Sequence, residues 1–188
     1  MKIYFHYSSD NFANCYLVGN EITGQAVLVD PSVIDANLLD HIEKNKFSME
    51  AVLITHGHKS HSQALPTILK IYNPRVYAAE TEISGTETKN VTGDGSFQEA
   101  GFNISYMSIP GHSPDSLLFK IGNVVFTGDS IFAGRLGHAA NRYGLKSLIT
   151  NLNAKLLNQN EKIILMPGHG PPSTIGAELR YNTDILLQ

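Results

Sequence analysis

The chain has 188 residues, of which 16% are charged and 42% hydrophobic, a composition typical of a folded globular protein. This length suffices for one substantial core, so we expect a single domain over residues 1–188. The net charge of −3 provides no basic surface of the kind that nucleic-acid binding needs. We therefore expect no nucleic-acid partner.

The first ten residues contain no basic stretch followed by a long apolar run, and no later segment approaches the length of a membrane span. This pattern predicts a cytoplasmic protein with no membrane partner. Cys15 is the only cysteine, which excludes an intrachain disulfide and a zinc site rich in thiolates.

Short β-rich runs and helical patterns alternate in the first half of the chain. Apolar residues at helical spacing follow Ile34, and the apolar run 51–54 leads directly into Thr55 and His56. Polar residues 80–96 predict a surface loop. The predicted strands are 2–7, 16–18, 26–29, 51–54 and 76–79, the first three of them antiparallel, and the predicted helices are 34–46 and 65–72.

The second half repeats this alternation. Gly122 and Asn123 separate two apolar runs and indicate a β-hairpin. The predicted strands are 102–109, 116–121, 124–126 and 162–166, and the predicted helices are 145–157 and 175–187. Two similar halves of this kind favour a layered α/β sandwich.

Three imidazoles fall within six residues immediately after a predicted strand, at His56, His58 and His61. Neutral imidazole is the commonest protein ligand for zinc and also suits iron and nickel, so a turn here would let the three converge on a metal ion. The alternative is a loop of three solvated histidines.

Further potential ligands stand at later strand ends, each beside a glycine that lets the backbone turn sharply. They are His112 in Pro-Gly-His-Ser, Asp129 in Thr-Gly-Asp-Ser and His169 in Pro-Gly-His-Gly. Loops at strand ends are where an α/β scaffold usually displays a site.

The ordered set His-x-His-x-x-His, Gly-His, Gly-Asp and Gly-His resembles the metallo-β-lactamase superfamily, in particular its glyoxalase II-like (hydroxyacylglutathione hydrolase-like) branch. The resemblance spans nearly the whole chain, from residues 14–18 and 29–31 to residues 167–176. It implies an α/β fold of the four-layer αβ/βα sandwich type, with the ligands gathered along one edge.

The resemblance also implies a ligand set for one or two zinc ions, with iron or manganese as alternatives. In the family's pattern a first metal is held by His56, His58 and His112, and Asp129 bridges to a second metal held by His61 and His169. Asp30 matches an early aspartate that supports the histidine loop from behind the ligands. On sequence alone, a turn residue at a strand end is an equal alternative for Asp30.

Ser60 departs from this pattern, because the family motif His-x-His-x-Asp-His has an aspartate there. The missing carboxylate would ligate the second metal and lie beside the attacking water. We therefore expect a first site that fills readily and a second that is partial or empty.

Two further departures concern the substrate. Asp115 stands where relatives commonly have glycine and alters the shape or charge of its loop. The chain also ends without the helical domain that glyoxalase II enzymes use to hold glutathione, so a glutathione thioester cannot be assumed. The candidate contacts for an anionic small-molecule substrate are Arg135, His138, Arg142 and Tyr143, with a solvated surface loop as the alternative for each.

These features predict a metal-dependent hydrolase of a thioester or ester that acts through a metal-bound hydroxide. The candidate catalytic residues are His58, Ser60 and Asp129. Without an acid at position 60, proton transfer to the leaving group is weak, which favours thiolate leaving groups. The alternatives are a mononuclear iron oxidoreductase resembling persulfide dioxygenases and a degenerate metal-binding protein.

Overall fold

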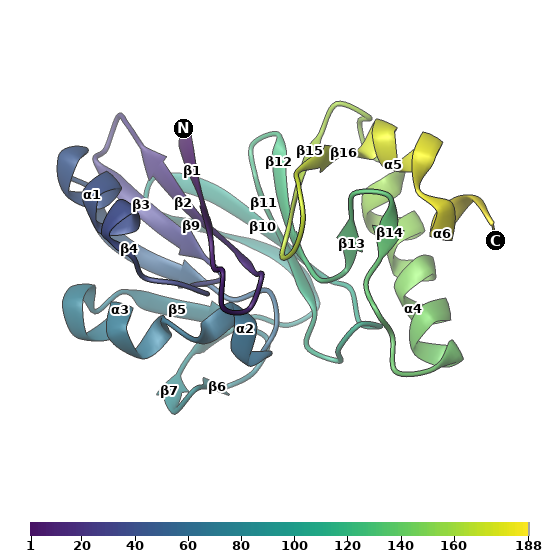
Figure 1. Ribbon diagram of the computed structural model, residues 1–188, viewed down its shortest axis with the longest axis horizontal. Coiled ribbons are helices and arrows are strands. Elements are labelled where there is room, and N and C mark those ends of the chain that lie inside the picture. The colour runs from purple at the N-terminus through teal and green to yellow at the C-terminus, as the bar shows by residue number, and fades with distance from the viewer. Residues whose placement is uncertain (188) are drawn as a thin grey trace.

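A computed structural model describes residues 1–187 and shows two six-stranded sheets packed face to face (Figure 1). The first sheet consists, in spatial order, of β1 (Lys2–Tyr7), β2 (Asn14–Asn20), β3 (Gln25–Val29), β4 (Ser48–Leu53), β5 (Arg75–Ala78) and β8 (Lys89–Asn90). The second consists of β16 (Ser173–Thr174), β15 (Ile164–Pro167), β12 (Val124–Gly128), β11 (Leu117–Ile121), β10 (Phe102–Ser108) and β9 (Asp94–Glu99).

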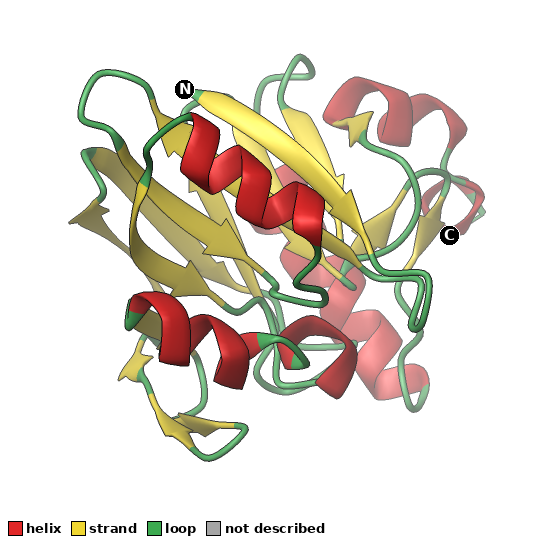
Figure 2. Ribbon diagram, turned by 60° about the vertical axis from the view of Figure 1, so that its left-hand side comes forward, coloured by secondary structure: helices red, strands yellow, loops and turns green. Residues whose placement is uncertain are grey.

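Helices cover the outer face of each sheet, which completes four layers (Figure 2). The helices on the first sheet are α1 (Ala36–Lys44) and α3 (Leu65–Tyr72), and the short α2 (Lys59–Ser62) precedes α3. The second sheet is covered by α4 (Arg142–Leu152), the π-helical turn η1 (Asn153–Leu157) and α5 (Ile175–Tyr181), followed by α6 (Thr183–Leu186). The expected α/β four-layer sandwich is confirmed.

The alternation of side chains along each strand explains the layers. On β2, Leu17 points toward α1 and α3, whereas Tyr16 and Val18 point toward the second sheet. On β11, Phe119 faces the first sheet and Leu118 faces α4. Because both faces are buried, these strands are continuous apolar runs, and three apolar cores separate the four layers.

The predicted loop over residues 80–96 is wrong. It contains β8, the start of β9 and a small hairpin of β6 (Glu82–Ile83) and β7 (Thr86–Glu87). β9 lies at the edge of its sheet and most of its side chains are exposed, so it has no apolar alternation. Its strand structure comes from pairing with β10, a contact that local composition does not reveal.

The predicted closing helix over residues 175–187 is also wrong, because Asn182 interrupts it. This residue is extended, and its side chain caps α6 by accepting a hydrogen bond from the Asp184 N–H at 3.1 Å. The helix predicted at 145–157 begins earlier, at Arg142, where the Asn141 side chain accepts hydrogen bonds from the backbone of the first turn. None of the helices over residues 1–187 has the length and apolar character needed to cross a bilayer.

Candidate metal centre

Three loops follow the ends of strands in the second sheet, all on the same side of that sheet, and carry the predicted ligands. β10 and β12 are both antiparallel to β11, and β15 is parallel to β12, so β10, β12 and β15 run in the same direction. Their ends therefore deliver His112, Asp129 and His169 to the same edge. The end of β4 meets them from the first sheet, where the Leu117 N–H donates to the Thr55 carbonyl at 2.8 Å.

The turn after β4 supplies the other histidines. His56 is buried, His58 stands at the start of α2, and His61 is buried within that helix. The His56 Nε2 and His58 Nδ1 atoms are 2.9 Å apart. His58 Nδ1 is also 3.1 Å from His112 Nε2, so three ring nitrogens from the two sheets converge.

Asp129 lies between two groups of donors. Its Oδ2 atom is 3.8 Å from His56 Nε2 and 3.7 Å from His112 Nε2, and its Oδ1 atom is 3.3 Å from His61 Nε2. His169 Nε2 lies 3.5 Å from Oδ2. The structure thus brings together two sets that share Asp129, and in each set the donor atoms lie within 4.8 Å of one another: His56, His58, His112 and Asp129 in the first, and His61, Asp129 and His169 in the second.

The hydrogen bonds on the far side of the rings determine which nitrogen faces the cluster unprotonated. The Nδ1–H of His112 donates to the His138 carbonyl at 2.7 Å, and that of His169 donates to the Phe12 carbonyl at 2.7 Å. Because a carbonyl only accepts, both Nδ1 atoms carry the proton in the neutral rings. Each Nε2 therefore directs a lone pair into the cluster.

Asp30 orients two further histidines, His61 directly and His56 through Thr55. Its Oδ1 atom accepts from the Thr55 N–H at 2.8 Å, and its Oδ2 atom accepts from the Thr55 hydroxyl at 2.7 Å. Oδ2 is also 3.0 Å from His61 Nδ1, which donates to it. Since the Thr55 hydroxyl proton is engaged, its oxygen accepts from His56 Nδ1 at 3.2 Å. In the neutral rings of His56 and His61, the unprotonated nitrogen is thus Nε2, which faces the cluster.

The electrostatics differ between the two sets. Burial, followed by the proximity of His61, lowers the pKa of His56 to about 4. Burial also lowers the pKa of His61, but the carboxylates of Asp30 and Asp129 outweigh it and raise that pKa to about 10. Burial raises the pKa of Asp129, but its histidine neighbours, chiefly His61, bring it down to about 2. In the metal-free protein His56 is therefore neutral at pH 7 and Asp129 is ionised.

The chain matches proteins of known sequence over most of its length, although no family model matches it. An uncharacterized protein of Mycobacterium leprae is 30% identical over 199 residues, which covers 90% of this chain and 91% of that protein. The hydroxyacylglutathione hydrolase GloC of Haemophilus influenzae is 28% identical, with 90% and 91% of the two chains covered. This chain belongs to the metallo-β-lactamase superfamily.

Solved structures of the superfamily have the same fold. The BLEG-1 B3 metallo-β-lactamase superposes with a TM-score of 0.85 at 24% identity, covering 98% of this chain and 99% of that one. ETHE1 from Myxococcus xanthus gives 0.87 at 24% identity, with 97% and 84% covered. The protein TTHA1623, solved in a di-iron-bound form, gives 0.80 at 25% identity, with 96% and 98% covered.

The cluster fits the metal ions of this superfamily. His61 Nε2 and Asp129 Oδ1 are buried 3.3 Å apart, and neither has a hydrogen-bond partner among the described residues, an arrangement that a bound cation would satisfy. Tetrahedral zinc with Zn–N bonds of 2.0–2.1 Å separates its ligand atoms by about 3.3 Å. The nitrogen separations of 2.9 and 3.1 Å in the first set are close to that value.

The start of β2 positions the loop that carries His169, a role that the sequence analysis did not predict. The Asn14 side chain is fully buried and donates to the carbonyls of Pro167 at 2.9 Å and Gly170 at 2.8 Å. The Tyr16 hydroxyl donates to the Pro167 carbonyl at 2.6 Å. These bonds join β2 to the end of β15 and the loop after it, so only the folded chain reveals their role.

Ser60 lies in α2 between His58 and His61 and is partly buried. Its carbonyl accepts a hydrogen bond from the Asn11 side chain at 3.2 Å. A glycine at 168 permits close packing nearby, because a Cβ there would overlap both Asp129 Oδ1 and His61 Cε1. The second donor set is thus tightly enclosed, yet it contains three residues where the first contains four.

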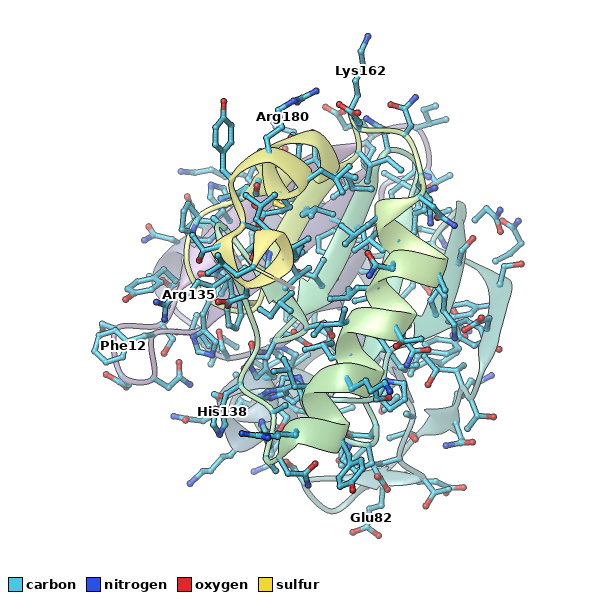
Figure 3. The ribbon with its side chains drawn as sticks, turned by 90° about the vertical axis from the view of Figure 1, so that its right-hand side faces the viewer. Phe12, Glu82, Arg135, His138, Lys162 and Arg180 are labelled. Atoms are coloured by element: carbon cyan, nitrogen blue, oxygen red, sulfur yellow. The ribbon has the colours of Figure 1, made fainter. Side chains whose placement is uncertain are left out.

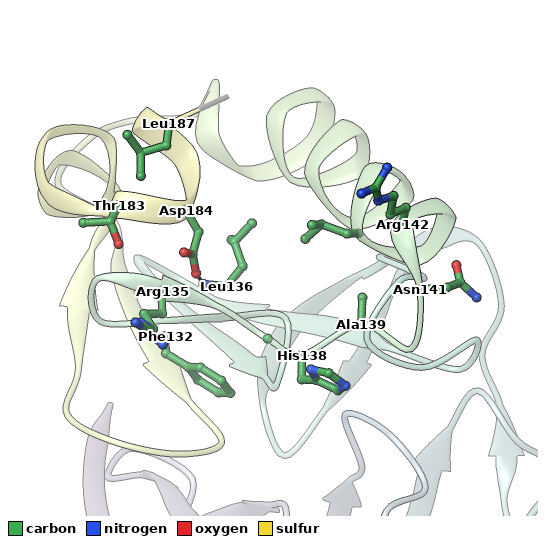
Figure 4. Close-up of a pocket in the computed structure, with 12 residues that line it drawn as sticks. Phe132, Arg135, Leu136, His138, Ala139, Asn141, Arg142, Thr183, Asp184 and Leu187 are labelled. Carbon is green, nitrogen blue, oxygen red and sulfur yellow. Dashed lines mark hydrogen bonds between the residues drawn. The ribbon is translucent and has the colours of Figure 1, made fainter.

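A pocket of about 750 Å³ borders the cluster. Figure 4 shows Arg142 on α4 at one side, Thr183 of α6 and the following Leu187 at the other, and His138 between them. His138 links the pocket to the cluster, because it lines the pocket and its carbonyl accepts a hydrogen bond from His112. The side chains of Arg135 and His138, which line this pocket, are exposed at the molecular surface (Figure 3).

Three of the four predicted substrate contacts, Arg135, His138 and Arg142, therefore line one pocket. Tyr143 does not line it, and its side chain is 87% exposed. Phe132, which the sequence did not single out, also lines the pocket and places its ring 6.1 Å from the ring of His169.

Proposed function

We propose that this chain is a metal-dependent hydrolase of thioesters or esters. The proposal rests on the convergence of five imidazoles and one carboxylate, with four imidazoles oriented by hydrogen bonds so that Nε2 faces the cluster. A divalent ion held there supplies Lewis-acid activation of a water molecule and of a carbonyl group. Its ligands are His56, His58, His112 and Asp129 in the first site, with His61, Asp129 and His169 in a weaker second site.

Asp129 and Ser60 determine which leaving groups are cleaved. Asp129 is ionised above a pKa of about 2, and its Oδ2 atom faces both donor sets, where it orients the attacking water as a hydrogen-bond acceptor. A serine hydroxyl at position 60 is a poor proton carrier in comparison with a carboxylic acid. Leaving groups that depart as anions, such as thiolates, are therefore favoured over amines.

The pocket beside the cluster provides a place for the non-reacting part of a small-molecule substrate. Over residues 1–187, neither Arg135 nor Arg142 forms an ion pair, so both guanidinium groups are available to an anionic substrate. Leu136 and Leu145 line the same pocket and favour a substrate with an apolar portion. An anionic acyl thioester, the class that a glyoxalase II-like enzyme hydrolyses, has both properties.

Zinc is the metal we propose, because it accepts several imidazoles with one carboxylate in tetrahedral geometry. Iron and manganese also bind imidazole and carboxylate ligands, and the similar protein TTHA1623 was solved with two irons. Metal analysis of protein purified without added metal shows directly which of these three metals the protein binds.

The decisive test combines metal analysis with hydrolysis of matched substrates. We expect zinc in the purified protein and faster hydrolysis of an acyl thioester than of the matching ester, with the amide slowest. His112→Ala should lose the ion of the first set and activity together. His41→Ala, which alters a histidine on α1 outside the cluster, should retain both. A protein that binds zinc and hydrolyses none of the three substrates would contradict the proposal and favour a degenerate metal-binding protein.

The pocket is tested separately with Arg135→Gln and Arg142→Gln. Each variant should raise KM for an anionic thioester about tenfold, the equivalent of about 1.4 kcal/mol, because it removes one charged contact. KM for a neutral thioester of the same length should stay unchanged. An equal rise for both substrates would show that charge recognition is absent.

An iron oxidoreductase is the second candidate, because two of the three histidines in the first donor set, together with Asp129, could form a set of two histidines and one carboxylate. Such a set, with open positions, is typical of non-haem iron oxygenases. Iron in the purified protein, together with oxygen consumption on a persulfide substrate, would replace the hydrolase proposal. Zinc without oxygen uptake would exclude this candidate.

A further inference from the structure

A carboxylate from the second half of the chain binds the histidine turn of the first half. Asp115 Oδ2 accepts a hydrogen bond from the Gly57 N–H at 2.6 Å, across 58 residues of sequence. Gly57 lies between His56 and His58, two members of the first donor set. Asp115 itself is no member of either donor set, so its contact is with the backbone of the turn.

The loop that carries Asp115 is held by its own contacts. The hydroxyls of Ser113 and Ser116 are 2.7 Å apart, and the Ser116 carbonyl accepts from the Ile109 N–H at 2.9 Å. The same loop begins at His112. A movement of Asp115 would therefore displace the His56 turn and His112 relative to each other.

Two contacts between the halves flank His56. Leu117 N–H donates to the Thr55 carbonyl on one side, and Gly57 N–H donates to Asp115 on the other. The space at Gly57 is tight, because a Cβ there would lie 3.2 Å from Asp115 Oδ2 and 3.3 Å from Ile83 Cδ1. A hydrogen bond from an amide to an ionised carboxylate is roughly twice as strong as a neutral one, so Asp115 restrains the turn more than a neutral side chain would.

We propose that Asp115 is a positioning residue that preorganises His56, His58 and His112, so that this set binds a metal ion without help from the second. The inference rests on the proposed metal centre. It explains how the first site remains effective although position 60 lacks a carboxylate. We expect the restraint to act on the first set, because Gly57 lies between two of its members, His56 and His58. His61 lies further along, within α2, and His169 belongs to a loop held by the Phe12 carbonyl.

The test measures metal affinity in the metal-free protein by competition with a chromogenic zinc chelator. A His169→Ala background isolates the first set, and a His112→Ala background isolates the second. We expect Asp115→Ala to weaken zinc binding to the first set about 10- to 100-fold, the range for residues that orient metal ligands, and to leave the second set unchanged. Asp115→Asn retains an acceptor oxygen and should stay within about threefold of the parent.

Asp94→Ala is the matched control. Asp94 is likewise an acid that accepts a hydrogen bond from a backbone N–H, that of Ser108 at the end of β10, at 3.0 Å, and it belongs to neither donor set. It should leave both affinities unchanged. Equal zinc affinity in Asp115→Ala and its parent would overturn this inference but not the proposed function. The same holds if Asp115→Ala and Asp115→Asn lose equal zinc affinity, or if Asp115→Ala weakens zinc binding at both sets. A parent protein without measurable zinc binding would overturn the proposed function as well.

Discussion

At the scale of single residues, Ser60 determines the balance between the two donor sets. It stands in α2 between His58 and His61, at the place where the superfamily motif has a carboxylate. The second set therefore has one anionic ligand, Asp129, which it shares with the first. Because the second set has three donor residues where the first has four, we expect it to bind its ion more weakly.

Ser60→Asp should strengthen binding of the second ion about tenfold, the equivalent of about 1.4 kcal/mol, because it adds an anionic oxygen ligand. Hydrolysis of a matched amide should rise at the same time, since the new carboxylate can carry a proton to the leaving group. Metal titration of the metal-free protein checks the first effect. The neutral Ser60→Asn serves as control, and an unchanged affinity in Ser60→Asp would show that this side chain does not face the second set.

Asn14 acts on the site through backbone rather than through a ligand. Asn14→Ala removes the donors to the Pro167 and Gly170 carbonyls and should lower the free energy of unfolding by about 2 kcal/mol. It should also weaken the second metal site, because these bonds position the loop that carries His169. Denaturant unfolding and metal titration measure the two effects. A lower free energy of unfolding with unchanged metal affinity would show that Asn14 does not position the second metal site.

At the scale of elements, the ends of buried strands were easier to predict than the strands at the edge of a sheet. The turn after β4 and the hairpin at Gly122 are visible in sequence because buried apolar runs stop there. In contrast, β9 is paired on one side only and most of its side chains are exposed, so its residues have the composition of a loop. The helical break at Asn182 depends on a buried bond from its side chain to Glu178, another contact that no local pattern shows.

The packing of β1 against α1 predicts a dependence on pH. Burial lowers the pKa of His6, followed by effects of Asp35, which raises it, and His41, which lowers it further. The unfolded chain therefore takes up the proton first as the pH falls, and stability is lost from about pH 6.5 downward until the folded protein is protonated too.

His6→Gln should flatten the fall of unfolding free energy between pH 7 and pH 5. Urea unfolding at several pH values measures it. The variant and the parent share every other histidine, so the difference between their slopes isolates His6. Identical slopes would contradict the assignment.

At the scale of the whole molecule, the site joins the two halves of the sandwich. His56, His58 and His61 come from the first half, whereas His112, Asp129 and His169 come from the second. Bound metal therefore crosslinks the sheets in addition to the apolar core between them.

Removing the metal with a chelator should lower the melting temperature by roughly 5 to 10 °C, because an ion at 100 times its Kd stabilises the folded state by about 2.7 kcal/mol. Differential scanning fluorimetry of the loaded and stripped protein measures the shift. His56→Ala should melt at the same temperature with and without chelator if the first set holds the stabilising ion. A shift that persists in this variant would place the ion elsewhere.

The sequence alone determined the identities of the donors, the departure at Ser60 and the alternation that produces four layers, because each is encoded by residues close together along the chain. The tertiary structure decided which ring nitrogen faces the cluster, how Asp30 and Asn14 support it, and that Asp115 reaches Gly57. Apart from the contact between the neighbours Thr55 and His56, those features depend on contacts between segments 25 to 157 residues apart. Such contacts form only when both sheets pack, so no local pattern can encode them.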